Sequence, residues 1–175
     1  MVLPTVADLA AMRGPIAIIG CGNPNRGDDG AGAEVVRLLR TAFNEHGGRV
    51  RLLDAGTDGM GVMFAARGCE MVIIIDACRS GAEAGAVFEV PGADLAQPPK
   101  DTFTLHDFRW DHALHAGRRM FTAEFPAAIT VFLIEAQHIE FGIGLSPAVA
   151  VAAERAAAII GDRVRAVYAI EEPAS

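Results

Sequence analysis

Carboxylates follow three apolar runs that are predicted strands. The stretch "IAIIGCGNPNRGDDGAG" (16–32) places Asp28 and Asp29 just after the first run, while Asp54 closes the second and Asp76 the third. Ligands of open α/β sheets bind beyond the carboxyl ends of the strands, so these side chains are predicted to share one rim. Such carboxylates could ligate a metal ion, or Asp29 and Asp76 could share a proton as an acid–base pair.

The glycine turn itself does not match a nucleotide site. Asn25 stands where the dinucleotide fingerprint needs its third glycine, and the charges of Asp28 and Asp29 would repel a pyrophosphate. No Gly-Lys-Ser/Thr follows, so a phosphate loop is excluded as well. The alternative to a direct functional role for the two aspartates is to stabilise the turn or cap the helix that begins at residue 31.

An imidazole could supply a third metal donor. The chain offers five, namely His46, His106, His112, His115 and His138. His106 ends a loop long enough to fold over the rim, and with two carboxylates it would form a site with open positions for substrate or water. Asp111 and His115, four residues apart on a predicted helix, form a second, local candidate pair.

Nucleophilic catalysis finds little support in the sequence. No Gly-x-Ser-x-Gly elbow is present. The cysteines Cys21, Cys69 and Cys78 are odd in number and lack Cys-x-x-Cys spacing, which predicts reduced thiols that pack rather than react.

The amino-acid composition argues against two classes of binding partner, nucleic acids and membranes. The 175 residues carry a formal net charge of −7, which argues against a nucleic-acid partner because phosphate binding relies on clustered Lys and Arg. No apolar run approaches the roughly 18 residues of a membrane span, and the first residues do not resemble a signal peptide. We expect a cytoplasmic protein without a membrane partner.

Strands and helices are predicted to alternate along the chain. The predicted strands are residues 16–20, 49–56, 71–77, 86–90 and 128–136, and the predicted helices are 31–48, 58–68, 107–121 and 144–162. Near-continuous apolar strands are typical of a sheet covered on both faces. The fold class is therefore α/β, a single-domain three-layer sandwich with a mostly parallel central sheet.

The last predicted helix has the clearest boundary residues. Ser146 is its predicted N-cap, Pro147 its first residue and Gly161 its end, while residues 91–105 are a predicted loop. We expect an N-terminal extension at 1–14, one domain at 15–171 and a tail at 172–175.

Five motifs in order resemble those of the hydrogenase maturation proteases, which process [NiFe]-hydrogenase large subunits. They are "GCGNPNRGDDGAG", "LLDAGTDGM", "VIIIDACRSG", "LHDFRWDHAL" and "GIGLSP", and they span roughly residues 16–161. The resemblance implies a phosphorylase/hydrolase-like α/β fold. The helix "DFRWDHALHAG" is more charged and aromatic than in many members, which bears on the precursor recognised.

The same resemblance implies a site and a reaction. Asp29, Asp76 and His106 match the family's nickel ligands and are the expected catalytic residues, while Asp54 and Asp28 are expected to position substrate. The expected reaction removes a C-terminal extension from a [NiFe]-hydrogenase large-subunit precursor after nickel insertion. Nickel would come from the precursor, with no organic cofactor, and we expect the enzyme to be a monomer.

Two rival functions remain open from the sequence. A non-catalytic nickel-binding chaperone could use the same ligands. Peptidyl-tRNA hydrolase also opens with a strand and a Gly-x-Gly-Asn-Pro turn, but its histidine-bearing block is replaced here by "NRGDDGAG", and the acidic balance disfavours tRNA.

Overall fold

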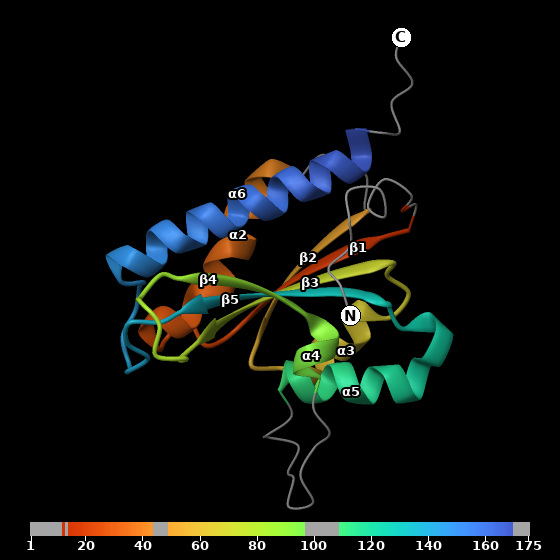
Figure 1. Ribbon diagram of the computed structural model, residues 1–175, viewed down its shortest axis with the longest axis horizontal. Helices are drawn as coiled ribbons and strands as arrows, with labels where there is room; N and C mark the ends of the chain where they lie inside the picture. The colour runs from red at the N-terminus through yellow and green to blue at the C-terminus, as the bar shows by residue number, and fades with distance from the viewer. Residues whose placement is uncertain (1–11, 13, 44–48, 97–108, 170–175) are drawn as a thin grey trace, which may run out of the picture.

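A five-stranded sheet forms the centre of the protein (Figure 1). The computed structural model describes residues 12, 14–43, 49–96 and 109–169. The strand order is β2-β1-β3-β5-β4. The strands are β1 (Ile16–Cys21), β2 (Val50–Gly56), β3 (Met71–Cys78), β4 (Val87–Pro91) and β5 (Ala128–Glu135). All neighbouring strands are parallel except β4, which runs antiparallel to β5 at one edge.

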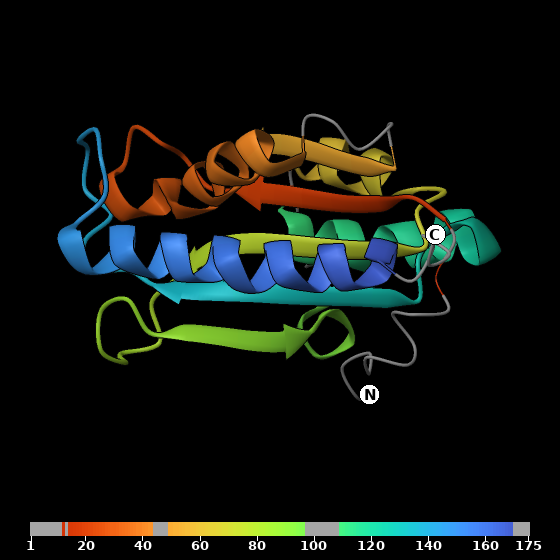
Figure 2. The same ribbon diagram turned by 90° about the horizontal axis from the view of Figure 1, so that it is seen from above.

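Helices cover both faces of this sheet. On one side lie α2 (Ala31–Phe43) and α6 (Pro147–Ala169), and on the other lie α3 (Gly59–Ala66), α4 (Gly92–Leu95) and α5 (Trp110–Phe121) (Figures 1 and 2). Within the described residues, the short 3₁₀ helix η1 (Gly27–Gly30) precedes α2, and η3 (Thr122–Glu124) follows α5. The three-layer α/β prediction is confirmed, as are all five predicted strands.

The alternation of side chains along the central strands explains why their sequences are almost wholly apolar. Ile16 and Ile18 of β1 belong to the core under α2 and α6, whereas Ala17 and Ile19 belong to the core under α3 and α5. Successive residues of a strand point to opposite faces, so a strand with a helix layer on each side needs an apolar residue at every position.

The close packing of α2 brings the first carboxylates to the sheet edge. A Cβ placed at Gly32 would clash with the backbone oxygens of Cys21, at the end of β1, and of Ile75, in the second half of β3. Only glycine lets the first turn of α2 lie directly on these strand ends. The 3₁₀ helix η1, which carries Asp28 and Asp29, is thereby held at the carboxyl edge of the sheet.

Several predicted boundaries are corrected. The last helix does begin at Pro147, but it passes through Gly161 and continues to Ala169. Buried Val164 and Val167 extend its apolar contact with the core, which outweighs the roughly 1 kcal/mol that a helical glycine costs. In the predicted loop 91–105, Pro91 ends β4 and residues 92–95 form the short helix α4, while residues 97–105 lie outside the described residues.

Other predicted segments lie partly or wholly outside the described residues. These are 44–48 of the first predicted helix, 107–108 of the third, and the tail 172–175. None of the helices in the described ranges is long and apolar enough to cross a membrane.

Asp28 joins two connections that are far apart in the sequence. Its fully buried carboxylate accepts hydrogen bonds from the backbone N–H groups of Gln137 (2.8 Å), His138 (3.1 Å) and Ser146 (2.6 Å). The Ser146 hydroxyl donates a fourth, at 3.0 Å. Ser146 thus precedes the last helix as predicted, but its hydroxyl serves Asp28. The connection 136–146 between β5 and α6 is pinned at both ends to η1.

The hydrogen bonds also determine the ionisation of Asp28. Burial alone would raise the pKa of this carboxyl. The donors from Ser146, His138 and Gln137 stabilise the charged form more strongly, so the pKa lies below its ordinary value. Asp28 is therefore an ionised structural anchor at neutral pH.

Replacing Asp28 with Asn should destabilise the fold. The amide NH₂ would face at least one buried backbone N–H, and an unsatisfied buried donor costs about 1–3 kcal/mol. We expect the free energy of unfolding in urea to fall by about 2 kcal/mol for Asp28→Asn. Asp29→Asn is the matched control and should cost less than about 1 kcal/mol, because Asp29 accepts one backbone hydrogen bond that an amide oxygen can keep. Equal stability of the two variants would contradict the anchoring role.

Candidate active site

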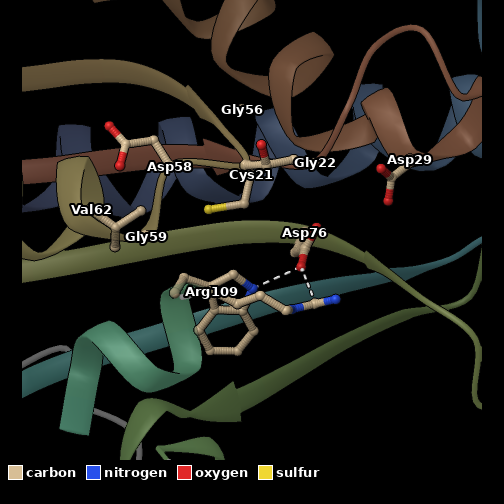
Figure 3. Close-up of a pocket in the computed structure, with 11 residues that line it drawn as sticks. Cys21, Gly22, Asp29, Gly56, Asp58, Gly59, Val62, Asp76 and Arg109 are labelled. Atoms are coloured by element: carbon tan, nitrogen blue, oxygen red, sulfur yellow. Dashed lines mark hydrogen bonds and ion pairs between the residues drawn. The ribbon is translucent and has the colours of Figure 1, made fainter. Parts of the chain in front are cut away.

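Asp29 and Asp76 line the same two adjoining hollows at the carboxyl edge of the sheet. The smaller hollow is bounded by the turn after β2 and the start of α3, and the larger, of about 410 Å³, by α5 and the end of β5. Gly22, labelled beside Cys21 in Figure 3, has a φ of +108°. A Cβ there would clash with the backbone oxygen of Asp29 and lie 3.4 Å from Oδ1 of Asp76, so only glycine fits.

Asp76 is a buried carboxylate with three donors. Its Oδ2 accepts from Nε1 of Trp110 at 2.7 Å and from Nη2 of Arg109 at 3.3 Å, and its Oδ1 accepts from the backbone N–H of Ala77 at 2.9 Å. Figure 3 shows Arg109 reaching Asp76 from the start of α5. These contacts fix the orientation of the carboxylate at the floor of the hollows.

The surroundings of Asp76 raise the pKa of its carboxyl group above that of an ordinary aspartate. Burial is the largest cause of its raised pKa, and the nearby charge of Asp29 raises the pKa further. Hydrogen bonds from Trp110 and Ala77 and the charge of Arg109 act in the opposite direction without cancelling the effect of burial. A cation in the hollow would relieve the same repulsion.

Asp29 is held less tightly than Asp76. Its Oδ2 accepts from the backbone N–H of Asn23 at 2.8 Å, within the turn that follows β1. This one bond orients the side chain, leaving lone pairs of both carboxylate oxygens free for a ligand in the hollow.

The remaining predicted carboxylates face elsewhere. Asp54 is exposed, accepts from the backbone N–H of Gly56 at 3.1 Å, and lines a separate hollow with Glu34, Arg37 and Arg40. Side chains two residues apart in a strand point to the same face of the sheet. Asp54 therefore shares the face of Leu52, which is covered by α2, whereas Asp76 shares the face of Ile74, which is covered by α5. Asp54 therefore lies at the same carboxyl edge of the sheet, as predicted, but it does not line the hollows that Asp29 and Asp76 share. A substrate-positioning role for Asp54 and Asp28 stays a prediction.

The predicted histidine ligand cannot be placed, since His106 lies outside the described residues. Within the described ranges, no group of three His, Cys, Asp or Glu side chains is arranged to hold a metal ion. Of the rival pair on α5, Asp111 lines the larger hollow, and His115 is not among the residues that line it. The metal-ligand role of Asp29, Asp76 and His106 stays a prediction.

Arg109 and Trp110 are site residues that the sequence analysis missed. Both line the two hollows and both donate to Asp76. The available signal was the unusual "FRWDH" stretch at the start of the third predicted helix, in which Trp110 is the one tryptophan of the chain. Arg109 offsets part of the negative charge of the two aspartates.

The cysteines near the site are not activated. The thiol of Cys21, which lines the smaller hollow, has a pKa raised far above its ordinary value by burial and by the charge of Asp76. Burial, with help from Glu135, raises the pKa of Cys78 to about 12. Both thiols are protonated at neutral pH and are poor nucleophiles, which favours their predicted packing role.

An open α/β sheet with paired carboxylates facing hollows at its carboxyl edge defines a ligand-binding site of the enzyme type. The chain belongs to the hydrogenase maturation protease family, since the family model of that description matches residues 33–163. This confirms the family resemblance and decides against the peptidyl-tRNA hydrolase alternative.

Individual relatives agree with this assignment. The chain is 30% identical over 159 residues to the coenzyme F420 hydrogenase subunit delta of Methanothermobacter thermautotrophicus, covering 85% of this chain and 94% of the relative. It is similar in structure to the hydrogenase maturating endopeptidase HybD from Escherichia coli, with a TM-score of 0.70, 26% identity and coverage of 86% and 92%. The fold also matches the [NiFe] hydrogenase maturation protease HycI from Thermococcus kodakarensis, with a TM-score of 0.68, 19% identity and coverage of 90% and 97%.

Trp110 should report the ionisation of Asp76 directly, because the one indole of the chain donates to this carboxylate. We expect the pH titration of tryptophan fluorescence to show a transition with a midpoint above the ordinary aspartate value of 3.8, since burial makes Asp76 retain its proton to higher pH. Asp76→Asn should abolish the transition, and Asp29→Asn should lower its midpoint by removing a repelling charge. A midpoint at or below 3.8, or an unchanged transition in Asp76→Asn, would contradict this description.

Proposed function

We propose that this chain is the endopeptidase that removes the C-terminal extension of a [NiFe]-hydrogenase large-subunit precursor after nickel insertion. In this proposal the nickel ion belongs to the substrate, and Asp29, Asp76 and His106 are the residues that bind it. The enzyme acts as a monomer and needs no organic cofactor.

The observation that carries the proposal is the shared hollow of Asp29 and Asp76. Carboxylate oxygens on two different elements face one space, and each retains lone pairs that no protein donor occupies. Borderline metals such as nickel accept oxygen and imidazole donors, which fits two aspartates and a histidine. Three protein donors leave coordination positions for the ligands that the precursor itself supplies.

Dependence on nickel follows from the charges of the site. A precursor without the metal would bring only a peptide to two carboxylates, one of them buried at an energetic cost. A precursor with the metal gains direct bonds to those carboxylates and relieves their mutual repulsion. Discrimination requires such a difference in affinity between the two substrate forms.

Once the precursor is bound, the chain's own groups have separable tasks. Trp110 and Arg109 hold Asp76 in place, so the metal-bearing segment meets a fixed carboxylate. Hydrolysis of the peptide bond needs a water molecule. In this proposal one oxygen of Asp29, the less constrained carboxylate, ligates the metal, and its other oxygen accepts the proton of that water. The larger hollow gives the adjoining peptide room beside Leu95, Leu133 and Ile139.

The relative from Methanothermobacter suggests which precursor to try first. By its name that protein belongs to a coenzyme F420 hydrogenase. A large subunit of this class of hydrogenase, bearing its C-terminal extension, is therefore the first substrate to test.

Asp29→Asn and His106→Ala should each abolish processing while the protein stays folded. We expect rates to fall by at least about a hundredfold, because Asp29→Asn replaces a charged metal donor with a weak neutral one and His106→Ala removes a donor altogether. Purified enzyme is mixed with precursor prepared with and without nickel, and the mass of the C-terminus is followed over time. Wild-type enzyme should cleave the nickel-loaded precursor only.

Matched controls make the assay decisive. Asp162→Asn applies the same change to an exposed aspartate of α6, and His115→Ala removes the histidine of the rival pair, so both should process normally. Equal cleavage of the nickel-free precursor would overturn the dependence on nickel. Binding of the loaded precursor by wild-type enzyme without any cleavage would favour the non-catalytic chaperone.

A further inference from the structure

The connection between β5 and α6, residues 136–146, holds two large apolar side chains out in solvent. Phe141 is 86% exposed and Ile143 is 93% exposed. Figure 2 shows this connection, in blue, projecting beyond the carboxyl edge of the sheet beside the segment that joins β1 to α2. Adjacent exposed apolar side chains at the edge of a binding site are a signature of protein–protein contact.

This connection is built to be rigid. The backbone N–H of Gly27 donates to the oxygen of Gly142 at 2.8 Å, and the N–H of Gly142 donates to the oxygen of Asn25 at 3.0 Å. Nε of Arg26 donates to the oxygen of Ile139 at 3.1 Å, and its guanidinium lies 5.3 Å from the centre of the Phe141 ring. Together with the buried Asp28 anchor, these contacts hold the apolar side chains in a defined position.

The position is continuous with the candidate active site. Ile139 lines the larger hollow together with Asp29 and Asp76. Phe141 follows Ile139 by two residues, whereas Ile143 lines the separate hollow that contains Asp54. A protein that places a segment between Asp29 and Asp76 would therefore bring the surrounding surface against Phe141 and Ile143.

We propose that Phe141 and Ile143 form a docking surface for an apolar patch on the hydrogenase precursor, next to the segment that is cleaved. The inference rests on the proposed function and adds a second contact to it, one that recognises the folded body of the substrate rather than its metal. Because the connection is already ordered, docking spends little free energy on fixing it. Asp28 then serves both contacts, since it anchors η1 and the docking surface together.

A second copy of this chain is a poorer occupant. Two apolar side chains bury on the order of 300 Å² on each partner, whereas stable interfaces between proteins bury about 800 Å² per partner. A substrate held at the active site supplies the remaining area itself. The same patch is thus too small to hold a dimer together and large enough to strengthen a complex that is also held elsewhere.

The double variant Phe141→Ser/Ile143→Ser tests the surface, with Met120→Ser as the matched control. Met120 is also exposed, at 62%, but lies near the end of α5, toward the opposite edge of the sheet. With nickel-loaded precursor, the double variant should raise KM by about tenfold or more and leave kcat within about twofold, as expected when two apolar anchors are lost from an interface. Met120→Ser should change neither constant.

Direct binding separates this inference from the proposed function. The Kd of immobilised precursor for each variant is measured alongside cleavage, and the double variant should bind at least about tenfold more weakly than wild type. If wild type binds the precursor without cleaving it, that loss of affinity would still support the docking surface while the protease proposal fails. Wild-type KM and Kd in the double variant, or a concentration-dependent dimer that the double variant abolishes, would overturn the docking surface.

Discussion

The hydrogen bonds to the buried carboxylate of Asp28 hold together the carboxyl edge of the sheet, where the candidate active site lies. These four hydrogen bonds fasten the turn after β1 to both ends of the connection between β5 and α6. The next residue, Asp29, points into the hollow that it shares with Asp76. One ionised group inside the protein therefore sets the position of a site residue and of an exposed apolar surface at the same time.

Asp28, Asp29 and Asp76 lie at the same edge of the sheet, but their surroundings give them different roles. Backbone N–H groups surround Asp28 and lower its pKa, which makes it a permanent anchor. Burial raises the pKa of Asp76, and Trp110 and Arg109 hold it in one orientation. Asp29 keeps a single backbone hydrogen bond and is the one free to meet a ligand. Environment rather than residue type separates structural carboxylates from those available for chemistry.

Much of this arrangement could be predicted from the sequence, because parallel strands end at one edge and side chains alternate along them. That rule predicts correctly that Asp29 and Asp76 lie close together. Asp54 does not share their hollow, since its place in β2 turns it to the opposite face of the sheet, and a prediction made only from strand ends ignores this parity. Arg109 and Trp110 reach Asp76 through the packing of α5 against β3, which no local spacing encodes. The helix α6 continues beyond Gly161, its predicted end, because Val164 and Val167 pack against the core.

We propose that Asp29 and Asp76 jointly bind a nickel ion that arrives with the substrate. Nickel X-ray absorption tests it most directly, on precursor alone and on precursor in complex with this protein. We expect complex formation to add oxygen and imidazole ligands to the nickel, and we expect Asp29→Ala and Asp76→Ala each to remove an oxygen contribution while the complex persists. A nickel coordination shell that is identical in the free and the bound precursor would contradict the account.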